Sequence, residues 1–209
     1  MKKLILAFSI MLFALNVNAQ SEKFQQAMST ALQEYNAAKD AATLTAVEAK
    51  FERIGDAEKN QWLPYYYAAL IKVHMSFAQM SDADKLADEA AGLIEKAKAI
   101  ESNSETLTIE AMIAMAKVIV NPAERWQEYG AKSNELLAKA KVADSTNPRP
   151  YVFQAQSLKS TPEQFGGGCV TAKPAAQKAL VLFASFKPAS PLHPNWGKDG
   201  AEKIIEDCK

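Results

Sequence analysis

The sequence AKVADSTNPRPYVFQAQSL, residues 140–158, has the pattern of two helices joined by a tight turn. Asp144 is placed to end the first helix, and Ser145, Thr146 and Asn147 suit the turn. Pro148 can begin the second helix, because a proline in the first helical turn loses no hydrogen bond. The stretch therefore predicts a helical hairpin.

Small and large side chains recur around this hairpin at the spacing that close helix packing requires. We expect the small residues to let helix backbones approach and the larger ones to fill the remaining gaps. These structural candidates are Ser133, Leu137, Ala140, Tyr151, Ala155 and Leu158. The pattern resembles the junction between two tetratricopeptide repeats (TPRs), which are helical hairpins stacked side by side.

Helical spacing of apolar residues extends over most of the chain. Phe24, Met28, Ala31 and Tyr35, for example, lie along one helix face. Helices are expected over 22–38, 41–54, 62–79, 82–101, 104–120, 122–143, 148–160, 172–186 and 198–208, and no stretch alternates like a strand. The predicted fold class is all-α.

The TPR resemblance implies antiparallel helical hairpins stacked as a right-handed superhelix with a C-terminal capping helix. We expect a single domain over residues 20–209. It would comprise an N-terminal hairpin (22–58), degenerate repeats (60–186) and a capping loop and helix (187–209). The alternative is an irregular helical bundle, because small residues at helical spacing occur wherever two helices pack closely.

The first residues, 1–19, have the pattern of a secretory signal peptide. Lys2 and Lys3 precede an apolar stretch of 12 residues, Leu4–Leu15, and small residues follow at Val17 and Ala19. A membrane-spanning helix needs about 20 apolar residues. The sequence therefore predicts export to the periplasm or beyond the cell, with no transmembrane segment after the signal peptide is removed.

The charge balance of the whole chain excludes one large class of partner. The sequence has 24 Lys and Arg against 24 Asp and Glu, and no basic stripe that would attract nucleic acid. We therefore expect no nucleic-acid partner.

The chemistry-bearing residues do not predict an enzyme. His74 and His193 are the only histidines, and neither has the spacing of a metal site or a catalytic pair. We expect no metal and no cofactor. An enzyme would require acids or His74 to converge on one cleft.

A glycine cluster, Gly166, Gly167 and Gly168, ends the segment PEQFGGG. It lacks the spacing of known phosphate-binding loops, so an inter-helix loop is the favoured interpretation over an anion site. This segment, together with Pro194-Asn-Trp196-Gly197, resembles exported TPR-like proteins of Bacteroidetes. The resemblance implies an architecture and does not identify a ligand.

Cys169 and Cys208 are the only cysteines. In an oxidising compartment they can form a disulfide that staples the last helix to the end of the stack. The alternative is two buried free thiols.

The TPR resemblance implies that the first helix of each hairpin lines an inner, concave surface. Its predicted lining is aromatic and rich in methionine, which suits an apolar partner. The candidates are Tyr67, His74, Ile109, Met112, Met115, Val152, Phe153 and Gln156. The same residues could instead form ordinary core, covered by the loop that contains Trp196.

Two functions follow from this surface. The first is a non-enzymatic exported protein that binds an unidentified envelope protein or peptide through the apolar concave face. The alternative is a soluble periplasmic small-molecule-binding protein, with a closed apolar pocket lined by Tyr67, Met112 and Phe153.

Overall fold

The computed structural model describes residues 22–209, and within them the chain forms helices and loops without a strand. The predicted all-α class is confirmed. The predicted signal peptide, residues 1–19, lies outside the described residues. After a helix over residues 22–37, the elements are α2 (Ala41–Glu58), α3 (Leu63–Phe77), α4 (Ala83–Ile100), α5 (Ser104–Val120), α6 (Pro122–Arg125), η1 (Trp126–Gly130), α7 (Ala131–Ala143), α8 (Arg149–Ser160), η2 (Glu163–Phe165), α9 (Cys169–Phe183) and α10 (Lys198–Asp207).

Three of the expected helices have clearly different bounds in the structure. The helix expected over 41–54 continues to Glu58. The helix expected over 122–143 is interrupted at η1, a π-helical turn. A π turn takes one residue more than an α turn, so it changes the direction of the side chains that follow. The helix expected over 172–186 begins earlier, at Cys169, because Gly168 turns the chain with a φ of 84° and the helix starts directly after it.

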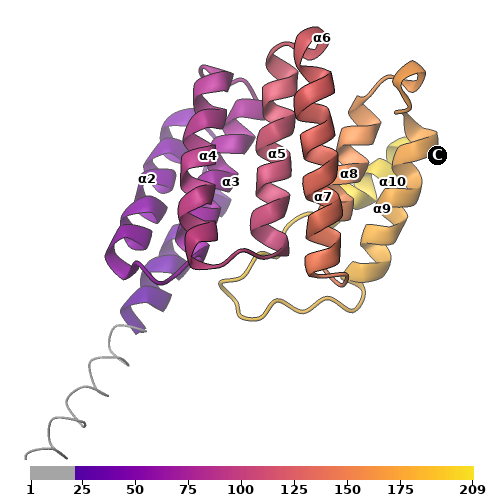
Figure 1. The fold of residues 1–209 in the computed structure, drawn as a ribbon. Helices are drawn as coiled ribbons and strands as arrows, with labels where there is room; N and C mark the ends of the chain where they lie inside the picture. The colour runs from indigo at the N-terminus through magenta and orange to yellow at the C-terminus, as the bar shows by residue number, and fades with distance from the viewer. Residues whose placement is uncertain (1–21) are drawn as a thin grey trace, which may run out of the picture.

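Consecutive helices lie side by side along the molecule, as Figure 1 shows. Contacts join α2 to α3, α3 to α4, α4 to α5 and α5 to α7, and then α8 to α9 and α9 to α10. Short connections and neighbouring placement are typical of antiparallel helices. The finer expectation, a TPR-like right-handed superhelix, stays a prediction.

The apolar core has two parts. The larger cluster joins the helices from residue 24 to α7 and includes Phe153 of α8 and Leu192, and a smaller cluster joins α8, α9 and α10. Ser133, fully buried in α7, donates a hydrogen bond to the carbonyl oxygen of Ala111 in α5 at 2.8 Å. Ala155 of α8 packs in the smaller cluster with Ala172 and Ala176 of α9. The small residues around the predicted hairpin therefore lie in two different helix contacts, Ser133 between α5 and α7 and Ala155 between α8 and α9.

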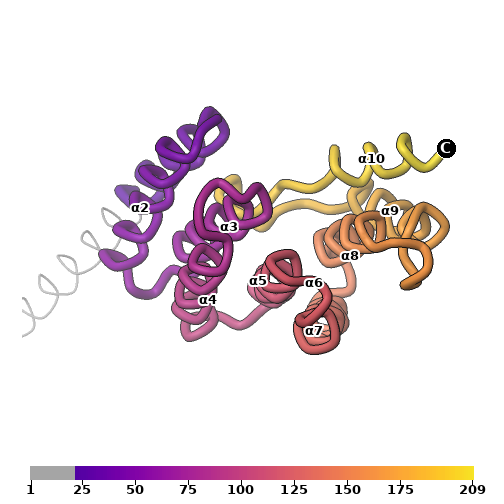
Figure 2. The backbone as a smooth tube through the Cα atoms, turned by 90° about the horizontal axis from the view of Figure 1, so that it is seen from above, coloured from indigo at the N-terminus to yellow at the C-terminus, as the bar shows by residue number. Residues whose placement is uncertain are grey.

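Residues 184–197, here called the C-terminal strap, run from α9 to the side of α3 and back to α10 (Figure 2). The Tyr67 hydroxyl donates to the carbonyl oxygen of Leu192 at 2.9 Å, and the indole Nε1 of Trp196 donates to the Tyr66 hydroxyl at 2.8 Å. The strap therefore covers the face of α3 that the sequence analysis assigned to the concave surface.

A disulfide joins Cys169, the first residue of α9, to Cys208, directly after α10. The Cα atoms are 5.2 Å apart, within the range that a disulfide spans. The predicted bridge is confirmed, and it fixes the end of α10 beside the start of α9.

Candidate functional site

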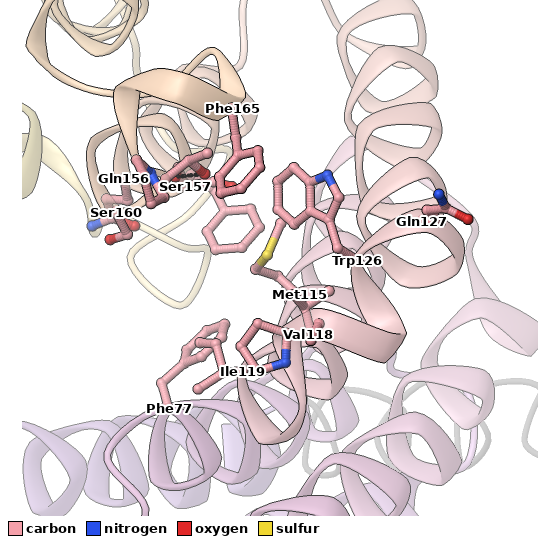
Figure 3. A pocket seen from close by; sticks show the side chains of 15 residues that line it. Phe77, Met115, Val118, Ile119, Trp126, Gln127, Gln156, Ser157, Ser160 and Phe165 are labelled. Atoms are coloured by element: carbon pink, nitrogen blue, oxygen red, sulfur yellow. Dashed lines mark hydrogen bonds between the residues drawn. The ribbon is translucent and has the colours of Figure 1, made fainter.

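An apolar groove of about 900 Å³ opens between α5, η1 and α8. One wall comes from the end of α5 and from α6 and η1. The opposite wall comes from α8 and the segment that follows it as far as η2, and Phe77 of α3 also lines the groove. Figure 3 shows that the side chains of Trp126, Met115 and Phe165 point into this space.

The lining is predominantly apolar and contains no charged side chain. Phe77 and Phe153 stack with ring centroids 6.1 Å apart. Trp126 and Phe165 remain 37% and 66% exposed, which is high for such large apolar side chains. The residues that line the groove are Phe77, Met115, Val118, Ile119, Pro122, Ala123, Trp126, Gln127, Phe153, Gln156, Ser157, Ser160, Thr161, Pro162 and Phe165.

Two basic side chains on the elements that wall the groove, Arg125 and Lys117, form ion pairs with α4. Arg125 contacts Asp84 at 2.6 Å, and Lys117 contacts Asp88 at 2.7 Å. The hydrogen bond from Arg125 lowers the pKa of the Asp84 carboxyl group. Because these charges have partners outside the groove, its interior is suited to an uncharged, apolar surface.

The structure separates the sequence-predicted binding residues into two groups. Met115, Phe153 and Gln156 line the groove. The other candidates do not line it: Tyr67, Ile109, Met112 and Val152 are buried, and His74 lies beneath the C-terminal strap. The C-terminal strap fills that part of the predicted concave face, and its Trp196 is the internal cover proposed from sequence.

Sequence reasoning missed Trp126, Ile119 and Phe165. Ile119 belongs to an ordinary helical run, and Trp126 begins a π turn that no spacing rule predicts. Phe165 belongs to the segment PEQFGGG, which the sequence analysis singled out for its glycines and not for its phenylalanine. The signal for it was a large aromatic residue in a polar, glycine-rich loop, where it has no helix face to pack on.

His74 lies outside the groove. Its Nδ1 is 3.2 Å from the Tyr35 hydroxyl, and its ring lies edge-on to Trp196. Burial disfavours the charged imidazolium and lowers the pKa of His74 to about 4. His74 is therefore a neutral core residue near pH 7.

We expect His74 to make the folded state less stable in acid. Its ordinary pKa is 6.5, and the folded pKa is about 4, so below pH 6.5 the unfolded chain takes up a proton that the folded chain does not. Stability is lost as the pH falls through this window, by about 3 kcal/mol in total. Urea unfolding at several pH values would show a shallower decline for His74→Gln than for the unmodified protein. Equal declines would contradict the prediction.

A second, polar cavity of about 580 Å³ lies at the other ends of α5 and α8, next to the C-terminal strap. Arg149, 1% exposed, donates from Nε to both carboxylate oxygens of Glu105, at 2.6 and 2.8 Å. Its guanidinium carbon lies 4.5 Å from the centre of the Phe186 ring. The ion pair joins α5 to α8, and the contact with Phe186 adds the C-terminal strap. Arg149 therefore stabilises the packing of these three segments.

Among residues 22–209, no group of three His, Cys, Asp or Glu side chains is arranged to hold a metal ion. In the same part of the chain, none of the helices has the length and hydropathy needed to span a bilayer.

The fold and groove define an all-α protein with a preformed apolar site, an arrangement suited to binding. No protein-family model and no curated protein matches the sequence. A solved structure, the HusA haemophore from Porphyromonas gingivalis, is similar with a TM-score of 0.80 and 35% sequence identity. The similarity covers 89% of this chain and 92% of HusA, so this chain belongs to the HusA family.

Proposed function

We propose that this protein is an exported haem-binding protein that holds the porphyrin ring in the groove between α5, η1 and α8. The observation that carries the proposal is a groove of about 900 Å³, walled by apolar and aromatic side chains, in a relative of a haemophore. That volume lies within the range of about 300–1,000 Å³ for small-molecule sites.

The lining suits the chemistry of a porphyrin. The ring has two flat apolar faces, which stack favourably on aromatic side chains such as Trp126, Phe153 and Phe165. Its propionates are charged and need water or polar partners. Gln156 and Ser160 are exposed and line the groove, so the propionates can point toward them and toward solvent.

The groove offers little to the iron of haem. Met115 carries the only side chain in the lining that commonly serves as an axial haem ligand, and no His, Cys or Tyr lines the groove. Burial of the ring would therefore supply most of the affinity. We expect haem and iron-free protoporphyrin to bind with similar affinity, within about fivefold, because they bury the same apolar area.

Of the two functions predicted from sequence, small-molecule binding is better supported than protein or peptide binding. The site differs from the closed pocket that was expected, since of Tyr67, Met112 and Phe153 only Phe153 lines it. The groove is also open to solvent on the side of Phe165. A porphyrin tolerates such an opening because its propionates remain hydrated.

The test is a titration of the mature protein with haemin and with protoporphyrin, followed by porphyrin absorbance and tryptophan fluorescence. Ile119→Glu places a carboxylate in the groove wall, where the bound ring would exclude its water. We expect this variant to weaken binding of both ligands by about 100-fold or more, since burying an unpaired charge costs several kcal/mol.

The matched control is Val181→Glu, the same kind of change at a residue of α9 that is 67% exposed and does not line the groove. It should bind both ligands like the unmodified protein. Equal affinities for Ile119→Glu and Val181→Glu would place the site elsewhere. An absence of binding to the unmodified protein would refute the function itself.

A further inference from the structure

The glycine cluster forms a tight turn whose conformation disfavours most side chains. Gly166 and Gly168 have φ values of 83° and 84°, a region that side chains disfavour. At Gly167, a Cβ atom would lie 2.0 Å from the carbonyl oxygen of Thr161. The amide of Gly168 donates to the carbonyl oxygen of Leu158 at 2.9 Å, which ties the turn back to α8.

The other end of the turn is anchored as well. Cys169 follows Gly168 directly and is bonded to Cys208. Lys173, one turn further along α9, donates to the carbonyl oxygen of Cys208 at 3.3 Å. The turn is thus held by α8 on one side and by the end of α10 on the other, so it is a fixed structure before any ligand enters.

This turn carries Phe165, which projects from the wall of the groove. The ring is 66% exposed, and it lines the same space as Trp126, which comes from the opposite wall (Figure 3). Because an exposed phenylalanine adds nothing to the core, its place on a rigid turn needs another explanation. Two aromatic rings on fixed opposite walls are suited to a flat ligand.

We propose that Phe165 determines specificity, so that the groove prefers a closed, flat tetrapyrrole to an open-chain one. The inference rests on the proposed function. A flat macrocycle can contact the rings of Phe165 and Trp126 with its π faces, and these contacts add to the burial of apolar area. An open-chain tetrapyrrole is twisted, so it cannot lie flat against fixed rings on both walls. Gly167 is the positioning residue that keeps Phe165 in place.

The experiment compares two ligands that share their pyrrole substituents, protoporphyrin and the open-chain biliverdin. We expect the unmodified protein to bind protoporphyrin about tenfold more tightly than biliverdin, the upper end of what a favourable aromatic contact contributes. Phe165→Ala should lose about tenfold in protoporphyrin affinity and less than about threefold in biliverdin affinity. Phe165→Tyr retains the ring and should keep the preference.

A second pair of variants tests the turn. Gly167→Ala forces the chain away from Thr161 and should reduce the preference as Phe165→Ala does. Gly166→Asn is the control, because no atom lies within 4 Å of a Cβ there and asparagine tolerates a positive φ. The ratio of the two affinities is the deciding measurement, because partial unfolding would lower both equally.

The outcomes separate the two proposals. One outcome is that the protein binds protoporphyrin while Phe165→Ala leaves the ratio of protoporphyrin to biliverdin affinity unchanged. That result would overturn the role of Phe165 and leave the proposed function intact. Equal affinities of the unmodified protein for both ligands would also overturn the role of Phe165 without contradicting the proposed function. Binding of neither ligand would overturn the proposed function and this inference with it. Phe165→Ala removes an exposed side chain, so folding does not limit the test.

Discussion

Replacing Glu105 with alanine is expected to lower the free energy of unfolding by about 3–5 kcal/mol, the scale for leaving one member of a buried ion pair without its partner. Glu105 is 12% exposed at its side chain and accepts from Arg149, which is 1% exposed. It also accepts from Asn147 at 2.8 Å and from the Tyr66 hydroxyl at 3.1 Å. All three donors would lose the Glu105 carboxylate at once, and only Asn147 would keep a second acceptor, the Ser104 hydroxyl.

Urea unfolding followed by circular dichroism would measure the effect, with Glu135→Ala as the control. Glu135 also forms an ion pair, with Lys139, but its side chain is 65% exposed, so its loss should leave the free energy of unfolding nearly unchanged. The double variant Glu105→Leu with Arg149→Met removes both charges and should recover at least half of the loss. A change below about 1 kcal/mol for Glu105→Ala would show that the pair contributes little.

Removing the disulfide should have an effect of similar size. Cys169 and Cys208 are 39 residues apart, and closing a loop of that length stabilises the folded state by up to about 4 kcal/mol by restricting the unfolded chain. The helix that it anchors, α10, has only 10 residues, too few for an isolated helix to be stable in water. We therefore expect the double variant Cys169→Ser with Cys208→Ser to have a lower free energy of unfolding. Its amide protons in α10 should be the first to lose protection from hydrogen exchange.

Thermal unfolding with and without dithiothreitol provides the control for the disulfide variant. The reductant should lower the melting temperature of the unmodified protein to that of the double serine variant and leave the variant unchanged. Equal melting temperatures for the oxidised protein and the variant would mean that packing of α10 against α8 and α9 is sufficient by itself.

The prediction of the site was partial, and particular residues show why. Met115 was named from the face of its helix, and it does line the groove. Tyr67 was named by the same rule, yet it is buried because the C-terminal strap, more than a hundred residues later in the chain, lies against it. Helical spacing assigns a residue to a face of its helix, and it does not state what covers that face.

The sequence alone was sufficient for the all-α class and most helix boundaries, and it offered the pairing of Cys169 with Cys208 as one of two alternatives, which the structure decided. These properties depend on local spacing of apolar residues, on helix-breaking residues and on the presence of a single cysteine pair. The groove was decided only by the tertiary structure. Its walls meet because α5 and α8 are neighbours in space, the π turn at η1 places Trp126 on one wall, and the glycine turn places Phe165 on the other. Such a site depends on packing between segments distant in the chain, which no local pattern encodes.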